Sequence, residues 1–522
     1  MKELVYHRML LPALETYADK VGFHDEHYSG TYAQHGDRVM RLCKALSSEL
    51  GVTRGARFAV MAVNRHEYLE LYHAAFLGAG VINPLNLRLA GKELDYIVRD
   101  SGTEVVFVDA FFADHFARAM AESDGDSPIR HTVLIGDGDV PHDIKYEDLL
   151  AAVDPSVPDE PEEEDAAVLM YTGGTTGLPK GVLIDHRAEM LNLYHVGMVI
   201  RFDPDSVYLH QTPMFHAASM GGILGTPAAG GTSVYMPLFE PGGAMSLIEQ
   251  YNVTQTVMVP TMIGMTLNHP DFKPERLESL QTLTYGASPM PAAILDQLLK
   301  LYPELDLSQG YGMTECSALL TWLDSDDHRA GGGRLRSAGR QVPGVVLSIQ
   351  DGDGTLLPRG ETGEVCAKSG NFMREYWNKP DATKEAFADG WYHTGDAGYL
   401  DADGYLFLVD RVKDMIVTGG ENVYSAEVES AISKHPAVAQ VAVIGIPHDI
   451  WGEQVHAIIV LKEGVEASED EIKEAAKAEI ASYKVPKSVE FRAEPLPLSG
   501  ALKVLKRELR KPYWEGQGRS VN

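Results

Sequence analysis

The chain has 522 residues, of which 44% are hydrophobic, and a formal net charge of −30. This length predicts more than one domain and a large buried core. The acidity argues against nucleic acid as a partner, because phosphate binding needs clustered lysine and arginine. No apolar run reaches the ~18–20 residues of a membrane helix, and the N-terminus lacks the apolar core of a signal peptide. We therefore expect a cytoplasmic protein.

Residues 1–150 alternate between helical and strand patterns. An amphipathic helix is predicted within the first 20 residues, a second at 31–50 and a third after Asn64, through residue 79. Strands are predicted at 58–63, 81–83, 105–108 and 132–135. Strands that alternate with helices indicate doubly wound α/β layers. The proline-rich, acidic segment 154–165 predicts a solvated connecting loop.

The next segments continue the strand pattern. Strands are predicted at 166–170, 181–184, 207–211, 232–236, 256–259 and 282–285, with a helix at 186–200. Ligands of open α/β sheets bind beyond the carboxyl ends of strands, so we expect the site there. Residues 324–340 are polar and glycine-rich and predict a loop. Residues 343–364 and 393–409 predict a smaller β-rich unit of short strands, with a turn at 401–404 (DADG).

A compact α+β pattern follows from residue 410. It predicts helices at 425–434 and 468–481, the second opened by a Ser468/Glu471 capping box, and strands at 438–444, 456–461 and 489–492. A segment of ~110 residues is large enough for a separate domain. We therefore predict an N-terminal domain of residues 1–409, a hinge at 410–414 and a C-terminal domain of residues 415–522.

The stretch 171–181 (YTGGTTGLPKG) holds four glycines and a single lysine, and follows an apolar strand. Glycine backbone N–H groups, threonine hydroxyls and the mobile charge of Lys180 suit a polyphosphate. The stretch is not a P-loop, because Pro179 precedes the lysine and Gly181 follows it, and it is not a dinucleotide fingerprint. The alternative is a glycine- and threonine-rich surface turn.

Five further segments carry candidate chemistry. They are 285–288 (YGAS), 309–315 (QGYGMTE), 391–396 (WYHTGD), 410–422 (DRVKDMIVTGGEN) and 497–503 (PLSGALK). A tyrosine between glycines can stack on a base, Glu315 is a hard oxygen ligand for Mg²⁺, and Arg411 can donate in a fork. Asp396 can accept from two ribose hydroxyls. Taken singly, the segments are also compatible with turns, a charged linker and a surface lysine.

In this order, the six motifs resemble those of the adenylate-forming superfamily, which includes acyl-CoA synthetases, adenylation domains of peptide synthetases and firefly luciferase. The resemblance covers nearly the whole chain and implies a large α/β N-terminal domain, with doubly wound sheet layers and a β-rich subdomain, and a small α+β C-terminal domain that moves. Two positions depart from the family pattern. Gly173 stands where serine is commonest, and Leu502 stands where glycine precedes the catalytic lysine.

The resemblance also implies roles for individual residues. The catalytic residues would be Lys503, Thr314, Glu315 and Lys180, with Glu315 also holding Mg²⁺. The ATP- and AMP-binding residues would be Thr172, Gly173, Gly174, Thr175, Thr176, Gly177, Gly286, Ala287, Ser288, Gln309, Gly310, Tyr311, Gly312, Thr314, Asp396 and Arg411. The acyl pocket would include His216, Gly286 and Met313, the hinge pivot would be Lys413, and the coenzyme A tunnel would be formed at Gly419 and Gly420.

His216 bears on the substrate. Amino-acid-activating relatives carry an aspartate at this position to pair an α-amino group, and a buried neutral or weakly polar group would not hold an ammonium. We therefore expect a carboxylic acid without an α-amine. Small residues after His216, with several methionines, indicate an apolar, adaptable pocket for a fatty or aryl acid, or else ordinary core. The residues meant are Ala217, Ala218, Gly221, Gly222, Met220, Met258 and Met262.

The function expected from these features is an acyl-CoA synthetase that uses ATP, Mg²⁺ and coenzyme A. It would form an acyl-adenylate with release of pyrophosphate, and then transfer the acyl group to the thiol. The alternatives are a luciferase-like oxygenase, an enzyme that loads a carrier protein, and a non-catalytic ATP-binding protein with Leu502 as the sign of decay. A homodimer is an assembly that the sequence leaves open. The three cysteines are far apart and indicate neither disulfides nor a zinc site.

Overall fold

The computed structural model divides the chain into two compact units. It describes residues 3–122, 127–172, 178–288, 290–411, 414–418, 421–448, 451–498 and 504–515. The first unit contains residues 1–335, 339–345 and 369–385, and the second contains residues 336–338, 346–368 and 386–522. The hinge expected at 410–414 lies inside the second unit, so the domain boundaries stay a prediction.

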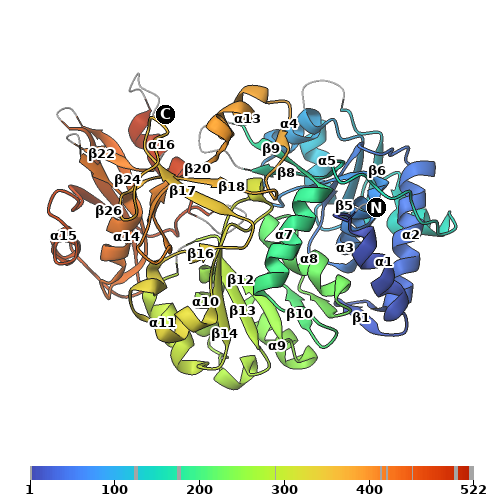
Figure 1. The fold of residues 1–522 in the computed structure, drawn as a ribbon, viewed down its shortest axis with the longest axis horizontal. Helices are drawn as coiled ribbons and strands as arrows, with labels where there is room; N and C mark the ends of the chain where they lie inside the picture. The colour runs from blue at the N-terminus through green and yellow to red at the C-terminus, as the bar shows by residue number, and fades with distance from the viewer. Residues whose placement is uncertain are drawn as a thin grey trace. The chain divides into compact units, whose positions relative to one another are not determined.

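Two sheets form the centre of the first unit (Figure 1). The nine-stranded sheet has the order β16-β15-β14-β13-β12-β10-β11-β1-β2. Its strands are β1 Val21–His24, β2 Ser29–Thr31, β10 Val207–His210, β11 Thr232–Tyr235, β12 Gln255–Met258, β13 Thr282–Gly286, β14 Asp306–Tyr311, β15 Thr321–Leu323 and β16 Arg340–Gln341. The inner pairs from β1 to β14 are parallel, and antiparallel strands lie at both edges.

The eight-stranded sheet has the order β19-β9-β8-β4-β3-β5-β6-β7. Its strands are β3 Arg57–Met61, β4 Val81–Pro84, β5 Val105–Asp109, β6 His131–Ile135, β7 Ile144–Lys145, β8 Ala166–Thr172, β9 Lys180–Asp185 and β19 Glu375–Tyr376. Strand neighbours that are distant in sequence require crossover connections, which helices supply here. The predicted doubly wound α/β layers are confirmed.

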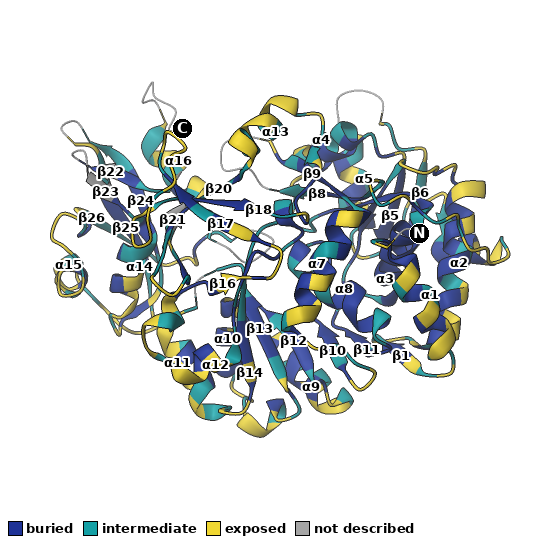
Figure 2. Cartoon of the chain, in the orientation of Figure 1, coloured by how far each residue is buried: buried dark blue, intermediate teal, exposed yellow. Residues whose placement is uncertain are grey.

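Helices connect the strands. They are α1 His7–Thr16, α2 Tyr32–Ser48, α3 His66–Ala74, α4 Gly91–Ser101, α5 Ala113–Ala121, α6 Tyr146–Ala151, α7 His186–Val199, α8 Met220–Ala228, α9 Pro241–Tyr251, α10 Pro260–Leu267, α11 Ala292–Leu301, α12 Ser325–Ala330 and α13 Pro380–Ala386. Their burial ranges from α3, which is buried on all sides, to α13, which has no buried residue. In α4 the buried side chains include Leu94, Ile97 and Val98, which is the spacing of one helical face. Figure 2 shows buried strands and exposed outer helix faces.

The segment 324–340 is not simply a loop, as the sequence predicted. It contains helix α12, which begins because the side chain of Asp324 accepts a hydrogen bond of 2.8 Å from the Asp327 backbone N–H. This is an N-cap, which satisfies a backbone donor that the helix itself leaves unpaired. The helix carries His328, which is buried and contacts Tyr285. The glycine content of 324–340 predicts a loop, whereas the N-cap at Asp324 stabilises a helix at its start.

The second unit contains two antiparallel sheets. One has the order β17-β18-β20-β21 and the other has the order β23-β22-β25-β24, with β26 parallel to β25. The strands are β17 Val346–Gln350, β18 Gly363–Lys368, β20 Tyr392–Leu400, β21 Leu406–Arg411, β22 Ile416–Thr418, β23 Glu421–Val423, β24 Val438–His448, β25 Gly452–Leu461 and β26 Ser488–Arg492. Helices α14 Ser425–Ser433, α15 Glu469–Lys477 and α16 Lys506–Trp514 complete it. The predicted Ser468/Glu471 capping box is present.

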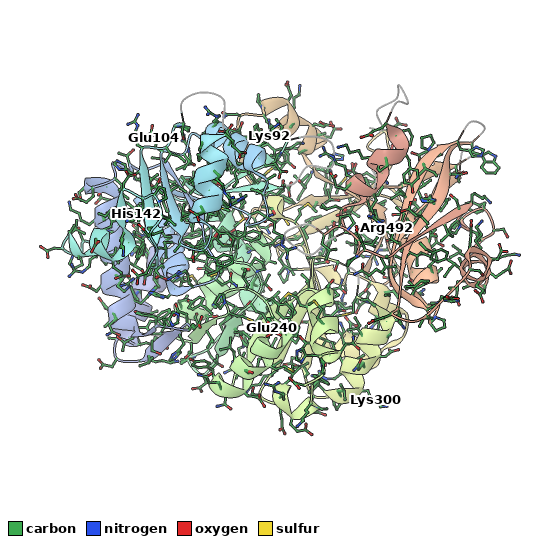
Figure 3. All side chains as sticks on the ribbon, turned by 180° about the vertical axis from the view of Figure 1, so that it is seen from behind. Lys92, Glu104, His142, Glu240, Lys300 and Arg492 are labelled. Carbon is green, nitrogen blue, oxygen red and sulfur yellow. The ribbon has the colours of Figure 1, made fainter. Side chains whose placement is uncertain are left out.

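Charged side chains cover the surface. Lys92, Glu104, Glu240 and Lys300, labelled in Figure 3, are exposed. Within the part of the chain that the structure describes, no helix has the length and apolar character needed to span a bilayer.

Candidate functional site

The glycine-rich stretch is held at both ends by an antiparallel hairpin of the first unit. Strands β8 and β9 pair so that Thr172 lies opposite Lys180. Tyr171, at the end of β8, donates a hydrogen bond of 2.7 Å to Oδ2 of Asp100. Gly173, Gly174, Thr175, Thr176 and Gly177 lie outside the described residues. The hairpin therefore brings the two ends of the predicted phosphate loop together at the edge of the eight-stranded sheet.

Tyr376 connects Lys180 to Glu315. The Lys180 ammonium lies 4.7 Å from the centre of the Tyr376 ring, a cation–π distance. The Tyr376 hydroxyl donates a hydrogen bond of 2.9 Å to Oε1 of Glu315. Strand β19 places the tyrosine there, because it pairs antiparallel with β9 and sets Tyr376 opposite Val182. The predicted phosphate-binding lysine and the predicted metal ligand are thus brought together through one aromatic ring.

Sequence reasoning missed Tyr376. It lies in the run Glu375-Tyr376-Trp377, which carries no glycine, charge pattern or spacing that marks a site. The pairing with β9 places it beside Lys180, and that pairing joins strands almost two hundred residues apart in the chain. The Trp377 indole donates to the backbone oxygen of Asp100 at 2.8 Å, which fixes the end of this strand.

Glu315 fits the role of a magnesium ligand. Its side chain is half-buried, and it is a hard oxygen donor of the kind that Mg²⁺ prefers. The hydrogen bond from Tyr376 uses one of about four lone-pair sites of the carboxylate, so a cation can still bind. Mg²⁺ commonly binds through one or two carboxylates together with substrate phosphates, and Lys180 lies nearby to meet phosphate charge.

The turn that carries Thr314 and Glu315 is tied to a distant segment. The backbone N–H of Met373 donates to the Glu315 carbonyl at 2.7 Å. The buried amide of Asn371 donates to the carbonyls of Cys316 and Leu319 at 2.8 and 3.0 Å. These bonds hold the residues after Tyr311 in a short 3₁₀ helix, Thr314–Cys316. The backbone of this predicted site is therefore fixed independently of any ligand.

The ends of β13 and β14 pack too closely for side chains. Gly286 lies opposite Gly310 in the parallel pair, and a Cβ on Gly286 would lie 2.4 Å from the Gly310 carbonyl oxygen. A Cβ on Gly312 would lie 2.0 Å from the carbonyl oxygen of Ala318. Ala287 has a φ of 66°, which is unusual for a residue with a side chain. Bare backbone at a carboxyl edge offers a flat surface for a ring.

Buried Tyr285 is anchored by His328. Its hydroxyl lies 2.9 Å from Nε2 of His328, whose Nδ1 lies 2.7 Å from the Asp324 carbonyl oxygen. Burial lowers the pKa of His328, so the ring is neutral and its Nδ1–H donates to the carbonyl while Nε2 accepts from the tyrosine. This chain of bonds fixes the residue before Gly286. No sequence signal marks His328, because it lies in the segment expected to be a loop.

His216 follows a loop that Asn64 holds in place. The Asn64 amide donates to the carbonyls of His210 and Thr212, each at 3.1 Å, and its oxygen accepts from the Met214 N–H at 2.8 Å. Nδ1 of His216 accepts a hydrogen bond of 3.2 Å from the Ala218 backbone N–H. Asn64 is buried, and no sequence signal marks it as part of a site. Its three bonds make it a positioning residue for His216.

The small residues after His216 have a packing role. A Cβ on Gly222 would lie 2.5 Å from the Tyr208 ring, and a Cβ on Gly221 would lie 3.1 Å from the Val196 side chain. Met220, Met258 and Met262 are buried. Close packing of α8 accounts for the two glycines, so the apolar acyl pocket stays a prediction.

The second unit brings two other predicted site residues together. Asp396 on β20 lies opposite Arg411 on β21 in an antiparallel pair. The backbone N–H of Asp396 donates to the Thr394 hydroxyl at 3.1 Å, and that hydroxyl donates to the Val365 carbonyl at 2.7 Å. Gly395, between them, has a φ of 70°, which favours glycine. The predicted ribose ligand is therefore on a defined turn.

Four other residues with predicted roles lie outside the described part of the chain. These are Lys413, Gly419, Gly420 and Lys503. Leu498 and Val504, on either side of the segment with Lys503, form an antiparallel bridge. Ser288, Gln309 and Met313 are described and half-buried, and their roles stay predictions.

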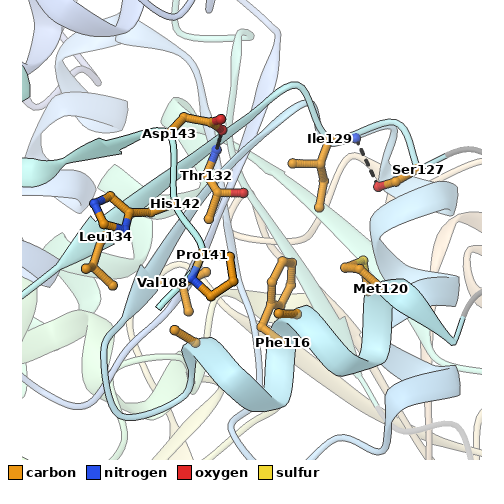
Figure 4. Close-up of a pocket in the computed structure, with 12 residues that line it drawn as sticks. Val108, Phe116, Met120, Ser127, Ile129, Thr132, Leu134, Pro141, His142 and Asp143 are labelled. Atoms are coloured by element: carbon orange, nitrogen blue, oxygen red, sulfur yellow. Dashed lines mark hydrogen bonds between the residues drawn. The ribbon is translucent and has the colours of Figure 1, made fainter. Parts of the chain in front are cut away.

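A separate cavity of about 400 Å³ lies between α5 and β6 (Figure 4). Phe116, Met120 and Leu134 give it an apolar lining, and His142 and Asp143 lie at its edge. None of the predicted site residues lines it.

Two family models match the chain. The model described as AMP-binding enzyme matches residues 12–377, and the model described as AMP-binding enzyme C-terminal domain matches residues 427–503. The first match contains Lys180, Glu315 and Tyr376, and the second ends at Lys503.

Characterised relatives cover nearly the whole chain. Feruloyl-CoA synthase of Amycolatopsis sp. is 37% identical over 92% of this chain and 94% of its own length. Long-chain-fatty-acid–CoA ligase FadD13 of Mycobacterium tuberculosis is 36% identical over 92% of this chain and 93% of its own. Fatty acid–[acyl-carrier-protein] ligase ScoC of Streptomyces coeruleorubidus is 33% identical over 99% of this chain and 100% of its own.

Solved structures also match nearly the whole chain. The anthranilate CoA ligase AuaEII in complex with anthranoyl-AMP superimposes with a TM-score of 0.88 at 26% identity, covering 98% of this chain and 97% of that one. ATP-bound MatB from Rhodopseudomonas palustris has a TM-score of 0.86 at 29% identity, covering 99% of both chains.

Proposed function

Because the chain belongs to the AMP-binding enzyme family and is an AMP-forming acid–CoA ligase for fatty or aryl acids, we propose a division of labour between its two units. The first unit binds the polyphosphate of ATP and the acid. The second unit contributes ribose contacts, the adenylation lysine and the route for the thiol. The observation that carries this proposal is the Lys180–Tyr376–Glu315 arrangement at the mouth of the β8–β9 hairpin.

In the first half-reaction the carboxylate of the acid attacks the α-phosphorus of ATP, and pyrophosphate leaves. Negative charge builds up on the phosphate oxygens, so fixed positive and hydrogen-bonding groups lower the barrier. Lys180 and the threonines of 172–176 bind the departing phosphates, and Thr314 donates to the α-phosphate. Mg²⁺, when held by Glu315, supplies positive charge to the phosphates. Tyr376 holds Glu315 and Lys180 in position for these contacts.

The bare backbone at Gly286, Ala287 and Gly310 lies against the adenine ring, and Tyr311 stacks on it. In the second unit, Asp396 accepts from the ribose hydroxyls and Arg411 donates to ribose or phosphate. The two residues lie opposite each other on one strand pair, so both can contact the same nucleotide. Lys503 stabilises the adenylation transition state.

In the second half-reaction the thiolate of coenzyme A attacks the acyl-adenylate and AMP leaves. A movement about Lys413 withdraws Lys503 and brings in the Gly419–Gly420 face. Alternation has a physical reason, because one site cannot hold both the adenylation lysine and the thiol route at once.

His216 borders the acyl group, and its neighbourhood carries no carboxylate aimed at an α-amine in the sequence run 215–218. The acid is therefore fatty or aryl. The relatives named above act on acids of both kinds. A second candidate is transfer to a carrier protein, which the match to ScoC over nearly the full length of both chains favours.

Pyrophosphate release tests the proposal. A panel of fatty and aryl acids is incubated with ATP and Mg²⁺, with and without coenzyme A, and thioester is measured in parallel. Acid-dependent pyrophosphate together with acyl-CoA is the expected result. Pyrophosphate without thioester would favour carrier loading, and no acid-dependent pyrophosphate would contradict the proposal.

A further inference from the structure

Three metal-ligating side chains of different kinds meet on one face of the β18–β20 pair in the second unit. Cys366 on β18 and His393 on β20 lie directly opposite each other, and Glu364 lies two residues before the cysteine. One ligand atom from each side chain lies within 4.8 Å of the other two. His393 lies 27 positions after Cys366 and 29 after Glu364, so no CxxC-type spacing in the sequence indicates a metal site here.

The two distances from Nδ1 of His393 are close to those around a tetrahedral zinc ion. Sγ of Cys366 lies 3.5 Å from Nδ1 of His393, and Oε2 of Glu364 lies 2.9 Å from the same nitrogen. A zinc ion binds about 2.3 Å from sulfur and about 2.0 Å from nitrogen. A tetrahedral angle at the ion then separates the sulfur from the nitrogen by about 3.5 Å. Nitrogen and oxygen ligands would be about 3.3 Å apart, so Glu364 must move by only about 0.4 Å.

The chemistry of the three ligands also suits such an ion. Thiolate and imidazole together select Zn²⁺-like ions over Mg²⁺ or Ca²⁺. One thiolate and one carboxylate neutralise a divalent charge, which lowers the cost of placing it among buried groups. The Cys366 side chain is buried, while His393 and Glu364 keep 22% and 28% exposure. An ion can therefore enter from solvent, and water can supply a fourth ligand.

We propose that Glu364, Cys366 and His393 form a binding site for a thiophilic divalent cation of the Zn²⁺ type. The site is distinct from the nucleotide and acid contacts proposed above and does not depend on them. Binding replaces the Cys366 thiol proton, which is released to solvent, and the His393 ring proton moves from Nδ1 to Nε2.

The site has a structural link to the predicted ribose ligand. Oε1 of Glu364 accepts a hydrogen bond of 3.0 Å from the Gly395 backbone N–H, immediately before Asp396. A cation on Oε2 draws this carboxylate toward the ion and shifts that turn. Occupancy is therefore expected to weaken nucleotide binding and slow adenylation.

Cobalt titration tests the proposal. Co²⁺ is added to the metal-free full chain without ATP, and the near-ultraviolet thiolate-to-cobalt band is followed. One equivalent of Co²⁺ with this band, displaced by one equivalent of Zn²⁺, is expected. Because the thiol must lose its proton, affinity rises with pH. The cluster Asp25–His66–Glu67, the other such group in the described chain, has no thiol and produces no such band.

Variants test whether Cys366 is the source of the thiolate-to-cobalt band. Cys366→Ser should abolish it, and Glu364→Gln should weaken Co²⁺ binding by about tenfold or more. Cys43→Ser, which changes another buried cysteine, should leave it intact. If Cys366→Ser does not fold, the wild-type titration still decides. Absence of the band in the wild type, or its persistence in Cys366→Ser, overturns the proposal and leaves a hydrogen-bonded triad only. Because the titration contains no ATP, its outcome leaves the cobalt-free pyrophosphate assay of the proposed function unaffected.

Discussion

The hydroxyl of Tyr376 donates a hydrogen bond of 2.9 Å to Oε1 of Glu315, and the two residues are 61 positions apart in the chain. The same ring lies 4.7 Å from the Lys180 ammonium. A hydrogen bond to a carboxylate orients it, and a ring beneath an ammonium limits where that charge can move. Tyr376 therefore positions Lys180 and Glu315, the two charged groups that we propose to meet ATP.

Replacing Tyr376 by phenylalanine removes the hydrogen bond and keeps the ring beneath Lys180. Hydrogen bonds to charged groups contribute about 1.5–3 kcal/mol, so we expect kcat/KM for pyrophosphate release to fall by about tenfold or more. The Mg²⁺ concentration for half-maximal rate should rise, which a loss of stability alone would not cause. Tyr302→Phe is the control, because it removes a surface hydroxyl bonded to the Pro274 carbonyl. An unchanged Mg²⁺ requirement would contradict the positioning role.

Lys503→Ala separates the two half-reactions. The lysine is proposed to stabilise charge only during adenylation, so acyl-AMP formation should be lost. Thioester formation from supplied acyl-AMP should be retained, and rapid-quench analysis of both steps measures this. Lys511→Ala, on the same basic tail and exposed, should affect neither step. Full retention of adenylation in Lys503→Ala would remove this residue from the mechanism.

Gly286→Ala tests the close approach of β13 and β14. The new Cβ would lie 2.4 Å from the Gly310 carbonyl oxygen, so the backbone must shift. Overpacking of this kind costs about 1–3 kcal/mol of stability, and we expect a weaker apparent affinity for ATP as well. Gly197→Ala is the control, since nothing lies within 4 Å of its Cβ in α7. That change should be neutral or should stabilise by about 0.5–1 kcal/mol in denaturant unfolding.

Asn64→Ala removes three hydrogen bonds from the loop before His216. The Met214 N–H loses its partner, whereas the His210 and Thr212 carbonyls still accept from Met236 and Ser219. One buried donor without a partner costs about 1–3 kcal/mol, so we expect a loss of about that size in unfolding free energy. If the loop positions the acyl pocket, KM for the acid should rise more than KM for ATP. Asn268→Ala removes one bond, to the Gly264 carbonyl at the end of α10, and should do much less. Equal increases in both KM values would argue against a specific role.

Buried histidines predict a loss of stability in acid. Burial lowers the pKa of His73 and of His210 to about 3 and that of His186 to about 4. The unfolded chain protonates these rings near pH 6.5, so their stability contribution is present above that pH and is lost as pH falls toward about 4. Each ring adds a slope of about 1.4 kcal/mol per pH unit in that window.

Denaturant unfolding between about pH 6 and pH 5 measures this slope. His210→Leu should reduce it by about one proton, because its buried ring is no longer there to titrate. His27→Leu changes a histidine whose side chain is 84% exposed and should leave the slope unaltered. The same slope in the His210 variant and the wild type would contradict the assignment.

Local sequence determined most of the secondary structure. The alternation of apolar strands with helices, the Ser468/Glu471 capping box and the DADG turn depend on neighbours a few residues away, and all are present. The error at 324–340 has the same local scale, because Asp324 caps a helix over Ser325–Ala330 that ends where the glycines begin. The motifs at 171–181 and 309–315 were equally readable, since glycines, a lysine and a carboxylate mark phosphate chemistry directly.

The sequence by itself therefore determined the fold class, the nucleotide chemistry and the reaction expected of this protein. Only the tertiary structure placed Tyr376 between Lys180 and Glu315, His328 behind Tyr285, Asn64 beneath the loop before His216, and Cys366 beside His393 and Glu364. These contacts join residues 27 to 196 positions apart through strand pairing and core packing. No local periodicity encodes such a contact, because it exists only once distant segments have folded against each other.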